Sequence, residues 1–424
     1  MSGPALKLLP SSTPGVMAAK LLMPWGSGCD AADERGSHQL LASCLSRGCG
    51  PLDHLQLADL VEGRGAGLRS EANEDGLLIS LRCTLEDADA LLPLLGWMVT
   101  SPSLEAEQVE LERSLSLQAL QRQKEDPFQV GFDAWRQLVY GDGPYGHDPL
   151  GIRDDLEKLT VDRIRSLATQ LPRGHAVLVL AGQWPDGLEK GLTEHLGWAA
   201  WSGSSQPSFA QGAVPWQPKG GSRITTTTME TEQVVITLGQ PCCSHGHPDD
   251  LALRLLQCHL GSGMSSLLFR RLREEHGVAY DVGAHLPARA GASPFVLHAS
   301  SSADRAELAL SLLQDSWQEL SHTTLTESEL DLARAKFRGQ IAHGGQTCSQ
   351  KAERCAQLHS FDLPEHHDQI CLDALDTLGP EQLRQAAQRW LQYPHLSLCG
   401  PGDTLRRMER CWERDQSEVS SCSS

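Results

Sequence analysis

The chain has 424 residues, of which 40% are hydrophobic, 21% charged and 5% aromatic, and its formal net charge at pH 7 is −18. This composition is globular, and the length predicts at least two domains, because single hydrophobic cores stop growing at about 250–300 residues. The negative charge repels phosphates and anionic lipid headgroups, which argues against nucleic acid and membrane surfaces as partners.

The sequence predicts a cytoplasmic protein. Its first 25 residues lack the apolar run and cleavage site of a secretory signal, and no run approaches the roughly 20 apolar residues of a membrane-spanning helix. Thirteen cysteines are scattered from Cys29 to Cys422. Their odd number favours free thiols in a reducing compartment over a disulfide framework.

Strand and helix patterns alternate in the first half of the chain. Residues 76–83 alternate apolar and polar side chains, which predicts a strand, and residues 86–99 have the period of an amphipathic helix. Pro102 ends that helix, a second helix follows from Leu104, and residues 175–182 form another apolar strand.

A segment rich in Gly, Ser, Pro and Gln, residues 201–223, separates this half from the next and predicts a linker. The second half again combines strands and helices. We expect strands at 232–239, 278–285 and 293–300, the last two paired, and helices at 248–260 and 265–276, the latter ended by Gly277.

Three segments recur in the same order, which predicts an internal duplication. The helix start at Leu104 matches that at Leu325, an offset of 221, and the apolar strand from His175 matches that from His395, an offset of 220. The segment that begins at Leu159 matches the segment that begins at Leu378, an offset of 219. Repeated segments at nearly one offset indicate two copies of one domain of about 200 residues.

The expected fold class is therefore α+β, with two tandem homologous domains, each a mostly antiparallel sheet with helices packed on one face. We place the N-terminal domain at residues 1–200, the linker at 201–223, the C-terminal domain at 224–415 and a flexible Ser-rich tail at 416–424. The Cys- and His-rich stretch 347–371 has no assigned role, and ordinary core and surface residues are expected there.

Familiar catalytic motifs are missing from this sequence. None of the 17 histidines forms the helical pair, four residues apart with a Glu between, that holds zinc in H-E-x-x-H or H-x-x-E-H sites. Structural zinc is also not expected, because no C-x-x-C pair occurs. The GSGMSS run from Gly261 lacks the Lys of a phosphate loop, so we expect a turn leading into a helix. No nucleophile can be nominated.

Arg273 and Tyr280 are the candidate site residues of the second half. Arg273 lies near the end of the predicted helix 265–276, and Tyr280 lies on the strand after Gly277. A guanidinium and a phenolic O–H that face one cleft could hold a peptide carbonyl and the oxyanion that develops from it. The alternative is that Arg273 belongs to a solvated helix face and Tyr280 is half-buried packing.

The block LGSGMSSLLFRRLREEHGVAYDV resembles the pitrilysin/insulinase zinc metallopeptidases, in particular the half-length branch that includes mitochondrial processing peptidase. The resemblance extends over nearly the whole chain, through GPYGHDPLGIRDDLEKLTVDRIRSL from Gly143 and HAVLVLAG from His175. It implies the duplicated α+β domain. It also implies that Arg273 and Tyr280 contact substrate from the domain opposite the zinc.

The metal motif of that family is lost where this chain reads GSHQLLASCLSRG. His38 keeps the first ligand position, whereas Leu41 replaces the catalytic Glu and Ala42 the second His. Gln118 and Ala119 are the candidates for the third ligand position, and neither is a carboxylate. We therefore expect no cofactor on this chain, and His38 is either a relic of a zinc site or, as we favour, a helix-surface histidine with an ordinary partner.

The resemblance implies a non-catalytic subunit that pairs with a homologous zinc-bearing peptidase subunit and acts on peptides. Zinc would reside in the partner, and this chain would be inactive alone. Two alternatives remain: a pseudoenzyme with a structural or peptide-binding role in a larger complex, and a homodimer without catalysis.

Overall fold

A computed structural model of the 424 residues describes residues 4–11, 14–171, 175–188 and 221–422. The chain divides into two compact units. Unit 1 comprises residues 1–121, 142–212 and 341–368, and unit 2 comprises residues 122–141, 213–340 and 369–424. Each unit therefore contains segments from both halves of the sequence. The expected linker falls almost entirely outside the described residues, and the expected domain boundaries stay a prediction.

Unit 1 is built on a five-stranded sheet with the order β1-β5-β2-β4-β3. β1 pairs with β5 in parallel, and the other neighbours are antiparallel. Alternate side chains of β2 point to opposite faces, so that Leu21 joins one buried cluster and Leu22 another. The strands are β1 Ala5–Pro10, β2 Val16–Met23, β3 Gly67–Ala72, β4 Leu77–Thr84 and β5 Val177–Gly182.

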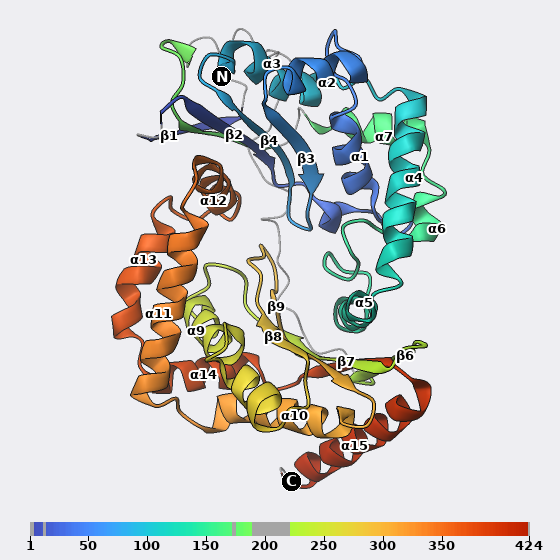
Figure 1. Ribbon diagram of the computed structural model, residues 1–424, viewed down its shortest axis with the longest axis vertical. Coiled ribbons are helices and arrows are strands. Elements are labelled where there is room, and N and C mark those ends of the chain that lie inside the picture. Colours follow the sequence, from blue (N-terminus) through green and yellow to red (C-terminus); the bar gives the residue numbers. More distant parts are fainter. Residues whose placement is uncertain (1–3, 12–13, 172–174, 189–220, 423–424) are drawn as a thin grey trace. The chain divides into compact units, whose positions relative to one another are not determined.

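Helices cover both faces of this sheet (Figure 1). The larger apolar cluster lies between one face and the helices of the first half, whereas a single helix from the second half, α12 Cys348–Ser360, packs against β2 and β5 on the other face. The other helices are η1 Ser27–Cys29, α1 Ser37–Leu45, α2 His54–Glu62, α3 Ala88–Thr100, α4 Ala106–Gln123, α6 Arg153–Leu156 and α7 Val161–Ala168.

Unit 2 repeats the topology of unit 1. Its sheet has the order β6-β10-β7-β9-β8, with β6 parallel to β10 and the other neighbours antiparallel. Each strand therefore occupies the position of its counterpart in unit 1, as the duplication predicts. The strands are β6 Ile224–Thr228, β7 Gln233–Pro241, β8 Asp281–His285, β9 Pro294–Ser302 and β10 His395–Gly400.

The helices of unit 2 also lie on both faces of its sheet. α9 Asp250–Gly261 and α10 Ala306–His322 contact one face, and α5 Pro127–Tyr140 lies on the other (Figure 1). The remaining helices are η5 Phe269–Glu275, α11 Glu327–Gly344, α13 His367–Ala374, η6 Leu375–Thr377, α14 Pro380–Trp390 and α15 Gly402–Cys422. α15 continues through most of the expected tail, because no Pro or Gly interrupts it.

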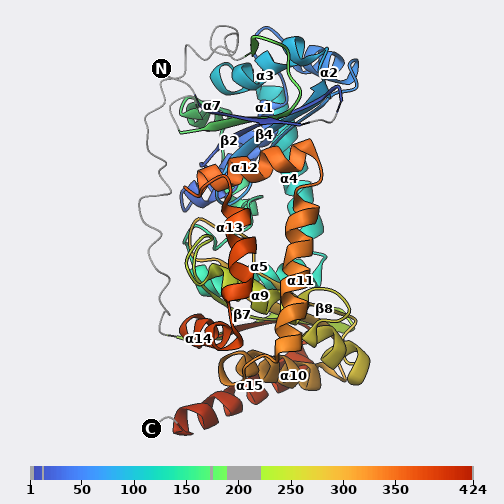
Figure 2. The same cartoon turned by 90° about the vertical axis from the view of Figure 1, so that its left-hand side faces the viewer.

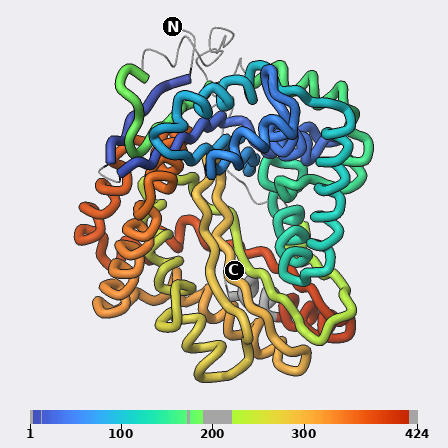
Figure 3. The backbone as a smooth tube through the Cα atoms, turned by 45° about the horizontal axis from the view of Figure 1, so that its top comes forward, coloured from blue at the N-terminus to red at the C-terminus, as the bar shows by residue number. Residues whose placement is uncertain are grey.

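One helix of each half is exchanged between the units. α5 begins at residue 127 and α12 at residue 348, an offset of 221, so the exchanged helices are counterparts in the duplication. Trp135 anchors α5, because its fully buried indole donates a hydrogen bond from Nε1 to the His395 carbonyl at 3.1 Å. On α12, Glu353 accepts a hydrogen bond from the buried Lys20 ammonium at 2.7 Å. Figure 2 and Figure 3 show orange α12 beside blue β2.

The structure confirms the α+β class and the two homologous sheets. The strand expected at 76–83 is β4, the strand at 232–239 is β7, and the pair expected from 278 to 300 is β8 and β9. We expected helices on one face of each sheet only, and the structure adds one exchanged helix on the second face of each sheet.

Candidate functional site

Arg273 and Tyr280 are joined by a tight turn between η5 and β8. η5 is a wide π-type helix, a geometry that recurs at functional sites. Its end is fixed by two backbone hydrogen bonds to the Leu272 carbonyl, from Val278 at 2.8 Å and from Ala279 at 3.3 Å. Gly277 has a φ of +61°, which lets the chain reverse there without strain.

The structure brings the two predicted residues together. The Arg273 guanidinium carbon lies 5.0 Å from the centre of the Phe269 ring and 5.8 Å from that of the Tyr280 ring, both within cation–π range. Arg273 is exposed, and 79% of the Tyr280 surface is exposed. The alternative of half-buried packing therefore does not describe Tyr280, which presents its ring and hydroxyl to solvent. The sequence did not indicate that Phe269 is the third member of this stack.

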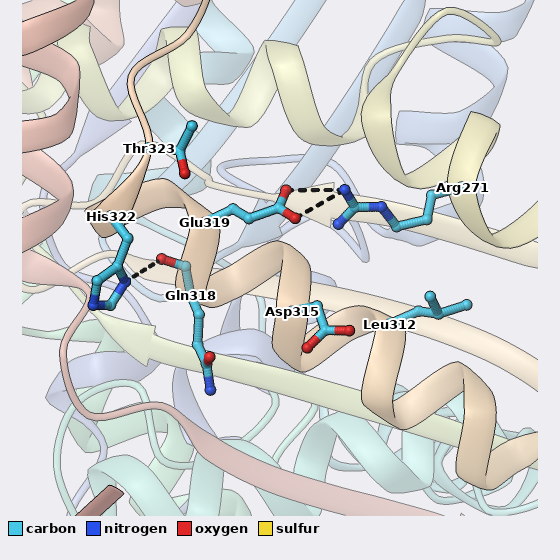
Figure 4. Close-up of a pocket in the computed structure, with 7 residues that line it drawn as sticks. All are labelled: Arg271, Leu312, Asp315, Gln318, Glu319, His322 and Thr323. Carbon is cyan, nitrogen blue, oxygen red and sulfur yellow. Dashed lines mark hydrogen bonds and ion pairs between the residues drawn. The ribbon is translucent and has the colours of Figure 1, made fainter. Parts of the chain in front are cut away.

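Arg271, two residues before Arg273, has a purely structural environment. Its guanidinium donates to both carboxylate oxygens of Glu319 at 3.0 Å (Figure 4). It also donates to the Ser316 hydroxyl at 2.9 Å. These bonds hold η5 against α10, beside a shallow groove that Asp315 and His322 also line. The contrast with Arg273 is clear, because no carboxylate among the described residues pairs with Arg273.

The first half contains His38 at the position that the resemblance assigns to a metal ligand. His38 lies on α1 and is only 2% exposed, so the expected surface position is wrong, whereas the expected ordinary hydrogen-bond partner is present. Its Nδ1 lies 2.6 Å from the buried Asp30 carboxylate, and the Trp25 ring packs edge-on at 4.4 Å between centroids. Its Nε2 is buried without a hydrogen-bond partner among the described residues. The sequence did not reveal Asp30, since it precedes the motif.

The surroundings of His38 do not fit a zinc ion. Leu41 and Ala42 are fully buried apolar residues of the core cluster, where they supply no ligand. On α4, Gln118 is exposed, and the buried Glu112 is paired with Arg47. Throughout the part of the chain that the structure describes, no group of three or more His, Cys, Asp or Glu side chains is arranged to hold a metal. A structural zinc needs four such ligands.

The first part of the Cys- and His-rich stretch, residues 347–359, is explained by packing. The Thr347 hydroxyl caps α12 by accepting a hydrogen bond from the Gln350 backbone N–H at 3.1 Å. Cys348 and Cys355 are buried against the sheet of unit 1, and burial raises the pKa of Cys355. The His359 ring stacks on His175 at 5.5 Å, within the same unit.

Comparison with known proteins relates this chain to one family of peptidases. Residues 158–337 match the sequence family described as the peptidase M16 inactive domain. The chain is a homologue of the M16 peptidases. It is 23% identical over 408 residues to an uncharacterized zinc protease of Streptomyces coelicolor, covering 93% of this chain and 88% of that protein. An uncharacterized zinc protease of Mycobacterium tuberculosis is 23% identical over 338 residues, covering 78% and 75% of the two chains.

Solved structures share the fold of this M16 homologue. The peptidase M16 inactive domain from Pseudomonas fluorescens superposes with a TM-score of 0.83 at 20% identity, covering 94% of this chain and 96% of that chain. A protease from Helicobacter pylori superposes with a TM-score of 0.85 at 16% identity, covering 94% of this chain and 97% of that chain.

Among the residues that the structure describes, none of the helices combines the length and the apolar character needed to span a membrane.

Proposed function

We infer that this M16 homologue is the metal-free subunit of a heterodimeric zinc peptidase, in which Arg273 and Tyr280 bind the peptide substrate. The observation that carries the proposal is the exposed stack of these two side chains. A guanidinium that lacks a carboxylate partner keeps its donors available, and the Tyr280 hydroxyl is exposed beside it. Two further observations support the proposal: residues 158–337, which include Arg273 and Tyr280, match the M16 inactive domain, and the His38 region fits zinc poorly.

The chemistry follows from the donors. The Arg273 fork and the Tyr280 O–H can both donate hydrogen bonds to the carbonyl oxygen of a scissile peptide bond. These bonds strengthen when that oxygen becomes an oxyanion, because a charged acceptor binds donors more tightly than a neutral one. Zinc and the attacking water belong to the partner. This chain orients the peptide and stabilises the charge that develops on it.

The test uses the complex of this chain with its zinc-bearing partner. Replacing Tyr280 by Phe keeps the ring over Arg273 and removes only the O–H, and Arg273→Ala removes the fork. Each change should lower kcat by a factor on the order of 10² to 10³, as one lost oxyanion donor does. The matched controls are Tyr393→Phe and Arg338→Ala, which alter exposed residues of the same unit.

Unchanged turnover for both Tyr280→Phe and Arg273→Ala would refute the proposal. It would leave the second candidate, a pseudoenzyme with a structural role, which one observation favours: Arg273 already packs on two rings of its own chain. Co-purification separates the two candidates. A homologous zinc-bearing partner, with peptidase activity that needs both chains, supports the first, and a large complex without such a partner supports the second.

A further inference from the structure

The Arg273 side chain is exposed, yet the proposed function needs it in one orientation. Among the described residues it makes no hydrogen bond or ion pair, and its contacts are with two aromatic rings. A long side chain that is free in solvent samples many rotamers, and fixing it when a peptide binds costs conformational entropy. A side chain that is ordered beforehand avoids this cost. The residue that orders Arg273 therefore contributes to the site.

Phe269 lies at the beginning of η5, four residues before Arg273. The guanidinium carbon is 5.0 Å from the centre of the Phe269 ring, which is closer than the 5.8 Å to the Tyr280 ring. Side chains four residues apart lie on the same face of a helix. The contact between Phe269 and Arg273 is therefore set by the helix itself and does not depend on the turn that follows.

η5 is well anchored, and so is the Phe269 ring. The neighbouring side chains Leu268 and Leu272 are fully buried, and Phe269 is half-buried between them in the sequence. Arg271 ties the same helix to α10 through its bonds to Glu319. Of the two rings that contact Arg273, Phe269 is thus the one that its own helix holds in place, because Tyr280 is 79% exposed.

An aromatic ring restrains an Arg side chain differently from a carboxylate. The carboxylate of Glu319 accepts N–H groups of Arg271 and so occupies those donors. The face of a ring attracts the positive charge, and the N–H groups of the guanidinium stay available for another acceptor. The contact with Phe269 therefore orders Arg273 while its donors remain free for a peptide carbonyl.

We propose that Phe269 is a positioning residue, which holds Arg273 in the orientation that binds the carbonyl oxygen of the scissile peptide bond. This inference rests on the proposed function of Arg273 and Tyr280 and adds a third residue to it. The Phe269 side chain has no hydrogen-bond donor or acceptor, so its contribution passes through Arg273. An aromatic ring is required at this position, and an aliphatic side chain does not replace it.

The test is a double-mutant cycle in the complex with the zinc-bearing partner. Phe269→Leu keeps an apolar side chain on η5 and removes the ring, and it should lower kcat about two- to fivefold, the effect of one exposed cation–π contact. Phe269→Tyr keeps the ring and should retain the wild-type kcat. In the Arg273→Ala background, Phe269→Leu should have no further effect, because the contact is already lost. Phe361→Leu, at a half-buried position in unit 1, is the matched control and should leave kcat unchanged.

A second measurement needs no partner. In an NMR spectrum of the arginine side chains of the isolated chain, the Nε–Hε signal of Arg273 is assigned by its loss in Arg273→Ala. The Phe269 ring should shift this signal away from that of a solvated Arg. Phe269→Leu should move the signal back towards the solvated position, and Phe269→Tyr should leave it displaced.

Several results would overturn the role of Phe269. These are a wild-type kcat for Phe269→Leu, an equal fall of kcat in the Arg273→Ala background, a kcat for Phe269→Tyr as low as that for Phe269→Leu, and an Arg273 signal that Phe269→Leu does not move. If Arg273→Ala and Tyr280→Phe slow turnover but Phe269→Leu does not, the proposed function stands and this inference alone fails. If Arg273→Ala and Tyr280→Phe turn over like the wild type, the proposed function fails, and the role of Phe269 fails with it.

Discussion

Acid should destabilise unit 2 in part through a histidine in the middle of its sheet. His395 lies on β10, between β6 and β7, and only 4% of its surface is exposed. Burial lowers the pKa of His395 from 6.5 to about 4, and the charge of Arg223 adds to this effect. The folded chain therefore holds this imidazole neutral at pH values where the unfolded chain protonates it.

The magnitude follows from proton linkage. Below pH 6.5 the unfolded state binds one more proton than the folded state, so the stability falls as the pH falls. The stability that comes from keeping His395 neutral is fully present above pH 6.5, and it is lost as the pH falls from 6.5 to about 4. At about 1.4 kcal/mol per pKa unit, the total loss is roughly 3 kcal/mol. This loss is a large fraction of the free energy of unfolding of a typical folded domain, which is roughly 5–15 kcal/mol.

The assay compares wild type with His395→Gln, which has no titratable group at that position. Urea unfolding at pH 7 and pH 4.5, with hydrogen exchange of the β10 amides, should show a smaller loss of stability in the variant. His322→Gln, at an exposed position on α10, is the matched control and should behave like wild type. The reasoning is refuted if wild type and His395→Gln lose the same stability between the two pH values.

Three further outcomes are expected. Gly283→Ala should lower stability by roughly 1–3 kcal/mol in thermal unfolding, because a Cβ there would lie 2.8 Å from the His298 ring; unchanged stability would show that this ring moves freely. Trp135→Phe removes the hydrogen bond to the His395 carbonyl and leaves that acceptor buried, which should destabilise unit 2 by about 1–3 kcal/mol in urea; an unchanged midpoint would contradict this anchoring role. The isolated chain should purify with far less than one zinc by elemental analysis, and tightly held zinc that His38→Ala removes would overturn the account of the first half.

Local patterns predicted the strands and the duplication, because alternation and apolar period are local properties of the chain. Matching offsets near 220 predicted two copies of one domain, which the identical strand orders confirm. The exchange of α5 and α12 could not be predicted in this way. Their sequences share almost no letters, and which sheet a helix covers is decided by contacts such as that of Trp135 with His395, 260 residues apart.

The candidate site was predicted in part. Residue types and spacing indicated Arg273 and Tyr280, and the turn at Gly277 brings them together. The burial of His38 could not be read from the sequence, because it depends on Asp30 and Trp25 from the preceding loop.

The exchanged helices make the two halves of this chain interdependent. A polypeptide cut between β5 and β6 would yield two fragments. The first would carry α5 but not the sheet of unit 2 that α5 covers, and the second would carry α12 but not the sheet of unit 1 that α12 covers. Each fragment made alone would expose an uncovered apolar sheet face and tend to aggregate. Produced together, the two fragments should complement each other into the intact architecture, so the peptide connection between the halves is dispensable once both have folded.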